Sequence, residues 1–195
     1  SKFDDFYFEE LPFDHPLYIM YSSGTTGLPK SIVHSSGGTL IQHLKELMLH
    51  TDLRRDDNIF YFTTCGWMMW NWLVSSLGVG ATVNLYDGSP FYPDGTTLLK
   101  MAEKAGITVF GTSAKYIATL ESVGIKPKTI STFPKLRTIL STGSPLGEEN
   151  YDFVYNHWKE NVQLSSISGG TDIISCFALG NPTLPVSRGE LQCRG

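Results

Sequence analysis

Residues 21–30 have the composition of a loop that holds phosphate. They read Tyr-Ser-Ser-Gly-Thr-Thr-Gly-Leu-Pro-Lys and follow an apolar run at 17–20, which we predict to be a buried strand. Glycine lets a ligand approach the backbone, consecutive N–H groups can form a concave anion site, and hydroxyls add donors. The candidate phosphate ligands are Ser22, Ser23, Gly24, Thr25, Thr26, Gly27 and the cation Lys30.

This loop differs from the common nucleotide P-loop. That motif places glycine directly before lysine, whereas Pro29 precedes Lys30 here, and Gly24 and Gly27 are too close together. A Gly/Ser/Thr surface turn is the plain alternative. Proline and lysine at fixed offsets after a strand favour the phosphate interpretation.

Two further loops could contact a nucleotide. Residues 141–146 (Ser-Thr-Gly-Ser-Pro-Leu) follow one predicted strand, and residues 168–172 (Ser-Gly-Gly-Thr-Asp) follow another. Each is also compatible with an ordinary turn or helix cap, because Ser, Thr, Asp and Gly favour both. Functionally, the first could form a backbone ledge for a planar base, and the second gains weight from its position after a core strand, downstream of residues 21–30.

An aromatic segment, residues 66–72, is very rich in large apolar side chains. It reads Gly-Trp-Met-Met-Trp-Asn-Trp, and a core helix accounts for most of these side chains. The five histidines show no metal-ligand spacing, so surface positions or hydrogen-bonded core positions are the better interpretation. They are His15, His34, His43, His50 and His157.

Strands that alternate with helices must position these loops. We predict an α/β fold with a largely parallel sheet flanked by helices, so that loops 22–30, 63–67, 111–115, 141–145 and 166–172 lie beyond the carboxyl ends of strands. Residues 1–16 are expected to be an irregular lead-in. The predicted strands are 17–22, 58–62, 81–86, 107–110, 136–140, 162–165, 173–179 and 189–192, and the predicted helices are 36–50, 67–77, 97–105, 114–123 and 147–159.

Composition excludes several classes of protein. The 195 residues carry a net charge of -4 with scattered basic residues, so nucleic-acid binding is not indicated. No apolar run has the ~20 residues that span a bilayer, and no signal peptide is visible. Cys65, Cys176 and Cys193 lack CxxC spacing, which favours reduced cysteines in a cytosolic protein.

The motifs together resemble the adenylate-forming acyl-CoA synthetase superfamily, and within it the acetoacetyl-CoA synthetase branch. The resemblance covers nearly all of residues 10–195 and rests on 21–30, 32–34, 66–72, 86–90 and 169–172. It implies that the chain is part of an N-terminal adenylation (AMP-binding) domain. It also implies an AMP-forming ligase that uses ATP, Mg²⁺ and coenzyme A, with acetoacetate as the acid.

The resemblance assigns roles to particular residues. Lys30, Thr171 and Asp172 become catalytic, with Thr171 on the α-phosphate and Asp172 on Mg²⁺, although the family usually carries Glu at 172. Ser168, Gly169 and Gly170 join the nucleotide site, and Thr142, Gly143, Ser144 and Pro145 border the adenine. Trp67, Met68, Met69, Thr142 and Gly169 line the acyl pocket, where glycine at 169 replaces a tryptophan that shortens the pocket in acetyl-CoA synthetases. Residues 111–115 resemble a segment near the pantetheine tunnel, though Ser113 is equally a helix cap.

Other interpretations stay open at this level. The family's ribose-binding aspartate and C-terminal catalytic lysine have no counterpart in these residues, so we expect a fragment that lacks the C-terminal lid and has little activity alone. We also expect it to expose apolar surface that the rest of its own protein covers. The alternatives are a ligase for another short or medium acid, a non-catalytic nucleotide- or acyl-CoA-binding relative, and an NTPase or phosphotransferase that releases γ-phosphate.

Overall fold

A five-stranded parallel sheet forms the centre of the structure. The computed structural model describes residues 7–22 and 27–195 of the chain. The strands follow the order β4-β3-β5-β6-β7, and each neighbouring pair is parallel. Their bounds are β3 Asn58–Tyr61, β4 Thr82–Asn84, β5 Val109–Ser113, β6 Thr138–Thr142 and β7 Gln163–Ser166. The predicted α/β fold with a parallel sheet is therefore confirmed.

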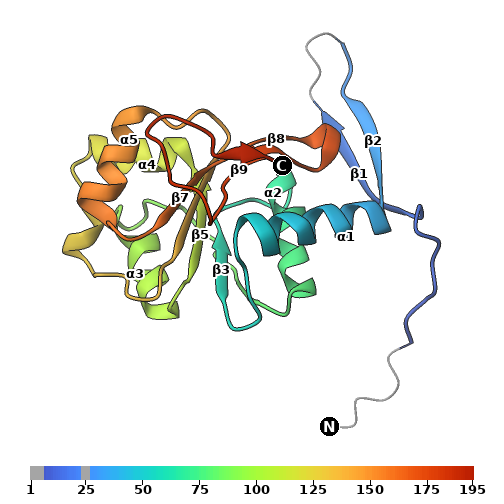
Figure 1. The fold of residues 1–195 in the computed structure, drawn as a ribbon, viewed down its shortest axis with the longest axis horizontal. Helices are drawn as coiled ribbons and strands as arrows, with labels where there is room; N and C mark the ends of the chain where they lie inside the picture. The colour runs from blue at the N-terminus through green and yellow to red at the C-terminus, as the bar shows by residue number, and fades with distance from the viewer. Residues whose placement is uncertain (1–6, 23–26) are drawn as a thin grey trace.

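Helices cover both faces of this sheet (Figure 1). One face packs against α3 Thr97–Ala105, α4 Ala114–Ser122 and α5 Glu148–Phe153, which continues as η4 Val154–Trp158. The other face packs against η1 Glu46–His50, which prolongs α1 Ser36–Lys45, and against α2 Met68–Val74, which continues as η2 Ser75–Gly78. A short helix, η3 Pro127–Thr129, follows α4 and contacts η4.

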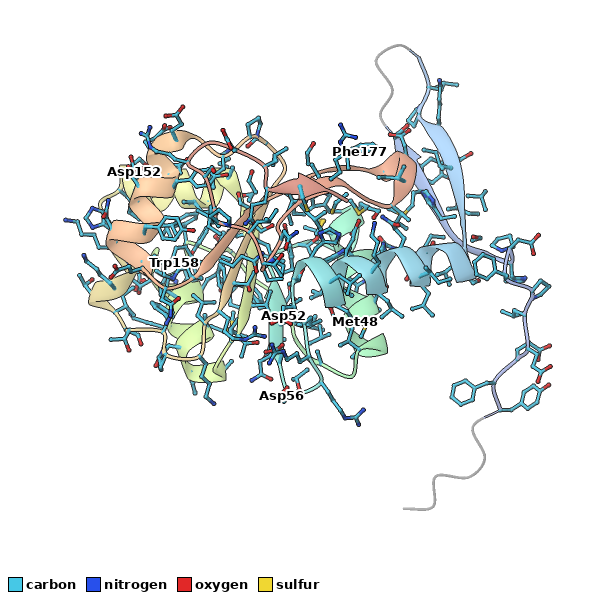
Figure 2. All side chains as sticks on the ribbon, viewed as in Figure 1. Met48, Asp52, Asp56, Asp152, Trp158 and Phe177 are labelled. Carbon is cyan, nitrogen blue, oxygen red and sulfur yellow. The ribbon has the colours of Figure 1, made fainter. Side chains whose placement is uncertain are left out.

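Alternating apolar side chains explain why the sheet has two covered faces. Ile59 belongs to the core on the α2 side, whereas the next residue, Phe60, belongs to the core on the α4 side. Successive strand residues point to opposite faces, so a strand buried on both sides reads as a continuous apolar run. On the α4 side, Trp158 packs edge-on against Phe110 at a centroid distance of 5.4 Å. Figure 2 labels Trp158.

Two predicted helix ends have the expected local chemistry. Gly106 ends α3 in the left-handed region with φ 63°, as predicted for a glycine C-cap. The Ser113 hydroxyl accepts a hydrogen bond from the Tyr116 N–H at 3.2 Å, so the N-cap interpretation of Ser113 is confirmed.

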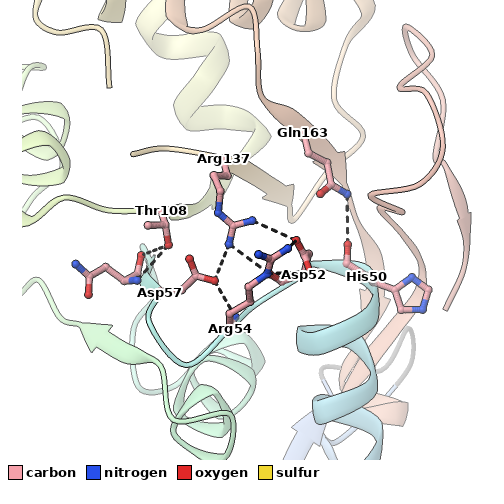
Figure 3. Close-up of polar contacts among 8 residues, drawn as sticks. His50, Asp52, Arg54, Asp57, Thr108, Arg137 and Gln163 are labelled. Atoms are coloured by element: carbon pink, nitrogen blue, oxygen red, sulfur yellow. Dashed lines mark hydrogen bonds and ion pairs between the residues drawn. The ribbon is translucent and has the colours of Figure 1, made fainter. Parts of the chain in front are cut away.

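An ion-pair cluster joins the amino ends of β3 and β6, which lie on either side of β5 (Figure 3). The Arg137 guanidinium lies 2.6 Å from the Asp57 carboxylate and 3.4 Å from that of Asp52. Asp57 is buried and also accepts a hydrogen bond from the Arg54 backbone N–H at 2.7 Å. The cluster therefore ties the turn before β3 to the residue that leads into β6.

The segment around the expected phosphate loop differs from its prediction. Residues 16–22 form β1 (Pro16–Ser22), but this strand is half-exposed and pairs antiparallel with β2 (Lys30–Ser35), a strand that the sequence pattern did not predict. Loop 22–30 therefore connects a two-stranded hairpin and does not follow a strand of the parallel sheet. Because both faces of β1 are apolar, its composition resembles that of a buried strand, yet only one face packs against the protein.

The hairpin leaves an apolar face in solvent, as expected for this chain. Ile19 and Val33 face each other across the strands and are 62% and 58% exposed. Tyr21 on the same face is 68% exposed. Before β1, residues 7–15 contain a turn but no helix or strand. Within the described part of the chain, no helix is long and apolar enough to cross a membrane.

A second small sheet also departs from the prediction. The sequence predicts a loop at residues 168–172, but Ser168–Gly170 form β8, followed by the 3-10 turn η5 (Thr171–Ile173) and β9 (Ser175–Leu179). β8 and β9 are antiparallel, and β10 (Cys193–Arg194) pairs with β9. The final strand thus lies slightly later than the predicted residues 189–192. Figure 1 shows this hairpin above α1, with its turn next to β1.

Candidate functional site

A cavity of about 540 Å³ lies where three strands of the parallel sheet end. The segments after β3, β6 and β7 supply most of its lining, which is where ligands gather in parallel sheets. Its volume is in the range of about 300–1,000 Å³ that small-molecule sites occupy. The lining residues are Trp67, Met68, Met69, Thr142, Gly143, Ser144, Pro145, Leu146, Ser166, Ile167, Ser168, Gly169, Gly170, Thr171, Cys176, Gly189 and Leu191.

The start of α2 forms an apolar wall of this cavity. Met68 and Met69 are buried, and Trp67 packs edge-on against Tyr61 at a centroid distance of 6.0 Å. Burial raises the pKa of Tyr61, whose hydroxyl donates to the Thr112 carbonyl at 3.2 Å. This side of the cavity is therefore uncharged and rigidly packed, and it can exclude water from a bound group.

The loop after β6 presents mostly backbone to the cavity. Thr142 is buried, and its hydroxyl donates to the Ile167 carbonyl at 2.9 Å, which joins the β6 and β7 loops. Gly143 has φ 92°, a conformation that glycine adopts without strain. Ser144 and Pro145 follow at the rim. The segment can form a flat ledge, because it carries no large side chain.

Gly169 lies on β8 directly against the backbone of β9. A Cβ atom at this position would be 2.4 Å from the Ser175 carbonyl oxygen, well inside contact distance. The expectation that glycine here simply removes a tryptophan plug is therefore incomplete. Glycine is also required by the strand pairing, so a larger residue at 169 would need a different hairpin.

Thr171 and Asp172 occupy the turn η5 at the end of that hairpin. Thr171 is half-buried and lines the cavity, whereas the exposed Asp172 lies beyond the lining. Among residues 7–22 and 27–195, no cluster of three His, Cys, Asp or Glu side chains could hold a metal by itself. Mg²⁺ commonly takes one or two carboxylates and completes its shell with phosphate oxygens and water. The exposed oxygen donor of Asp172 fits that kind of site.

The predicted phosphate ligands are only partly described. Ser23, Gly24, Thr25 and Thr26 lie outside the described residues. Gly27 has φ 102°, and Lys30 is exposed at the start of β2. Neither Ser22, Gly27 nor Lys30 lines the cavity, but β1 and β2 lie beside η5 (Figure 1). The structure therefore brings the hairpin next to Thr171 and Asp172.

Residues 111–115, the histidines and the cysteines, all in the described part of the chain, do not form a second site. Residues 111–115 do not line the cavity, since Ser113 caps α4 and Lys115 is exposed. His43 is a fully buried, hydrogen-bonded core residue, and His34 and His50 make part-buried hydrogen bonds, as expected. The three cysteines are free.

Sequence reasoning missed several lining residues. Cys176 and Leu191 line the cavity although no motif includes them, and Ile167 lines it although it was not named as a candidate within the predicted loop 166–172. Burial and the nearby Glu46 carboxylate raise the pKa of Cys176, so its thiol stays protonated near neutral pH. Ile167 could have been found, because it lies between β7 and residues 168–172. Leu191 could not, because a long segment returns it to the site.

Comparisons with known proteins agree on one family. The model described as AMP-binding enzyme matches residues 5–190. An acetoacetyl-coenzyme A synthetase of Rhizobium meliloti (strain 1021) is 61% identical over 188 residues, and one of Danio rerio is 60% identical over 187 residues. Each alignment covers 96% of this chain, which spans only 29% and 28% of those relatives. The solved acetoacetyl-CoA synthetase from Streptomyces lividans matches with a TM-score of 0.91 and 47% identity, over 96% of this chain and 30% of that one.

Proposed function

The chain belongs to the AMP-binding enzyme family, and we propose that the protein containing it is an AMP-forming ligase that joins acetoacetate to coenzyme A. Residues 1–195 would be part of its adenylation domain. The relatives' names support acetoacetate as the acid. The free cysteines fit a reducing compartment, which supports a cytosolic location.

One observation carries the proposal. Three loops, each of which has a sequence suited to a different part of the chemistry, line a single cavity around residues 67–69, 142–145 and 168–171. An apolar wall, a backbone ledge and a polar turn thus meet at the edge of a parallel sheet. This combination suits a small acid that must lie beside the phosphate of a bound nucleotide.

In the first step, a carboxylate oxygen of the acid attacks the α-phosphorus of ATP. The bond to the bridging oxygen breaks, which gives acyl-adenylate and pyrophosphate. We assign Lys30, Gly27 and the hydroxyls and N–H groups of residues 22–26 to the β- and γ-phosphates, where negative charge accumulates on the leaving group. The Thr171 hydroxyl would orient the α-phosphate, while Gly143, Ser144 and Pro145 border the adenine.

In the second step, the thiolate of coenzyme A attacks the acyl carbonyl carbon and AMP leaves. Trp67 and Met69 would hold the acyl group against the apolar wall and keep water from hydrolysing the adenylate. Thr142, Met68 and Gly169 complete the acyl pocket. The other reacting groups of the ligase would come from outside residues 1–195, so we expect little or no turnover by this chain alone.

A magnesium ion would be held by Asp172 together with the phosphate oxygens of ATP. When bound, it neutralises phosphate charge and polarises the phosphorus for attack. Shortening the usual Glu to Asp at this position removes one methylene, which shifts the carboxylate toward the turn backbone.

The test is isotope exchange between pyrophosphate and ATP in the full-length protein, with acetate, propionate, acetoacetate and octanoate as separate acids. The proposal predicts acid-dependent exchange that is strongest with acetoacetate. Strongest exchange with another acid would reject the assigned substrate but keep the ligase. Nucleotide binding without exchange would indicate a non-catalytic relative, and release of the γ-phosphate would indicate an NTPase or phosphotransferase.

A further inference from the structure

A buried carboxylate, Glu46, lies outside the lining of the cavity. It belongs to η1 with 0% of its surface exposed, and it forms no salt bridge with any described residue. A buried carboxylate is costly unless hydrogen bonds replace its hydration. Its hydrogen-bond donors should therefore reveal what it stabilises.

Those donors come from two directions. From the helices, Gln42 donates to Oε1 at 3.0 Å and the Trp72 indole donates to Oε2 at 2.9 Å. From the hairpin, the Cys176 backbone N–H donates to Oε1 at 3.0 Å, and the Ser175 hydroxyl also donates to Oε1. Glu46 thus fixes the first two residues of β9 to the helical layer.

The buried histidine one helical turn earlier holds the same hairpin. His43 is 0% exposed, and its Nε2 donates to the Ile174 carbonyl at 2.5 Å. Ile174 has φ 49°, a left-handed conformation that a branched side chain disfavours. The turn between Asp172 and β9 is therefore held in a conformation that its own sequence does not favour, and His43 bonds to the strained residue.

A third contact reaches the turn from β2. The His34 Nε2 donates to the Thr171 carbonyl at 2.8 Å. His34, His43 and Glu46 thus hold the β8–β9 hairpin from outside the cavity. Their hydrogen-bond partners in the hairpin are Thr171, Ile174, Ser175 and Cys176. No other described side chain donates a hydrogen bond to the Thr171 or Ile174 carbonyl.

We propose that Glu46 and His43 are positioning residues that set the place of Thr171 and Asp172 relative to the nucleotide. This inference rests on the proposed function, since it concerns how the same site is preorganised. Neither side chain lines the cavity, so both act through the hairpin backbone. Removing such supporting contacts around a metal or catalytic group typically costs about 10–100-fold in affinity or activity.

The experiment compares variants of the full-length protein. Glu46→Gln keeps the size of the side chain but replaces one carboxylate oxygen by an NH₂ group. This NH₂ group must face either the Trp72 indole N–H or the Ser175 and Cys176 donors, so at least one hydrogen bond is lost. His43→Gln keeps an N–H donor near Ile174, whereas His43→Ala removes it. Ile117→Val and Leu120→Ala, on the opposite face of the sheet, serve as controls that lower Tm without touching the hairpin.

Three readouts separate positioning from loss of stability. We expect Glu46→Gln and His43→Ala to lower kcat of pyrophosphate exchange and raise the Mg²⁺ concentration for half-maximal rate, each by about tenfold or more. His43→Gln should recover part of the loss. Controls with an equal loss of Tm should keep the Mg²⁺ dependence of the unmodified protein. Deuterium uptake in residues 168–179 should rise only in the Glu46 and His43 variants.

The outcomes are distinct. Unchanged Mg²⁺ dependence in Glu46→Gln, or equal changes in the controls, would overturn the inference while leaving the ligase assignment intact. Absence of exchange in the unmodified protein would reject the proposed function instead. In that case deuterium uptake still decides: unchanged uptake at 168–179 in both Glu46→Gln and His43→Ala would overturn the positioning role.

Discussion

Gly169 and Ser175 approach so closely that no side chain fits between them. A Cβ atom on Gly169 would lie 2.4 Å from the Ser175 carbonyl oxygen and 3.2 Å from the Cα atom of Cys176. Both contacts are with backbone, which cannot rotate away. This contact keeps β8 against β9 and thereby places the turn that carries Thr171 and Asp172.

Gly169→Ala should therefore impair the site even though alanine is small. We expect a lower Tm and a loss of about tenfold or more in kcat/KM for pyrophosphate exchange, because one strand must move. Gly66→Ala is the matched control. A Cβ atom at residue 66 would have its nearest neighbour, the Thr64 hydroxyl oxygen, 4.0 Å away. Equal behaviour of the two variants in thermal melts and exchange assays would show that the β8–β9 contact is unimportant.

The Thr142 hydroxyl should serve the fold more than the ligand. Its hydrogen is committed to the Ile167 carbonyl, so it is not available as a donor to a substrate. Thr142→Val keeps the shape and should cost about 0.5–1.5 kcal/mol of stability. We expect kcat/KM to stay within about threefold, which corresponds to well under 1 kcal/mol. A tenfold loss with unchanged Tm would instead place this hydroxyl on the substrate.

Asp57 should make the protein sensitive to acid. Burial by itself would raise the pKa of Asp57, but hydrogen bonds from Arg137, Thr108 and the Arg54 backbone outweigh it, and the pKa falls below 3.8. A lowered folded-state pKa contributes stability that is present above the unfolded value and lost as pH falls through the folded one.

Asp57→Asn should accordingly lower stability at pH 7 by about 1.5–3 kcal/mol, the range for a hydrogen bond to a charged group. The difference from the unmodified protein should begin to shrink near the unfolded pKa of aspartate, about 3.9, and should go on shrinking as pH falls through the lowered pKa of folded Asp57. Denaturant unfolding at several pH values measures this. A difference that stays constant with pH would mean that the Arg137 pair contributes nothing.

His43 should contribute a second pH dependence, in a higher range. Burial lowers the pKa of His43 below 6.5, although the Ile174 hydrogen bond and Glu46 raise it in part and His34 lowers it further. Below pH 6.5, His43 binds a proton more readily in the unfolded chain than in the folded protein. The free energy of unfolding therefore falls with decreasing pH. One histidine supplies at most about 1.4 kcal/mol per pH unit.

His43→Gln should flatten this dependence. The Tm of the unmodified protein should fall more between pH 7.5 and pH 5.5 than that of the variant, measured in the same buffers. His50→Gln is the control, because this histidine is less buried and bonds a different carbonyl, that of Gly180. Identical pH slopes in all three proteins would contradict the lowered pKa of His43.

The parallel sheet was predictable because its strands are apolar on both faces. Ile59, Phe60 and Tyr61 form a run that only a doubly covered strand explains, and loops after such strands must share one edge. That rule predicted that loops 63–67, 141–145 and 166–172 lie together, and residues of all three line the cavity. It also grouped 22–30 and 111–115 with them, but residues 111–115 and the described part of 22–30 do not line it. β8 escaped prediction because Ser168, Gly169 and Gly170 carry almost no side-chain signal.

Other features depend on contacts that no local pattern encodes. β2 was missed because residues 21–30 were interpreted as a phosphate loop followed by a helix. Residues 32 and 34 nevertheless lie two positions apart, as the residues on one face of a strand do. The buried positions of His43 and Glu46 were equally hidden. Each bonds to a residue about 130 positions later, so their role follows only from the packed hairpin.

The central claim is that the acid becomes bonded to AMP during the reaction. The most direct test uses acetoacetate labelled with ¹⁸O in its carboxylate, with ATP, Mg²⁺, coenzyme A and the full-length protein. If the acid attacks the α-phosphorus, AMP leaves with one ¹⁸O atom, which mass spectrometry detects. Label in inorganic phosphate, with none in AMP, would show attack on the γ-phosphorus and contradict the adenylate mechanism.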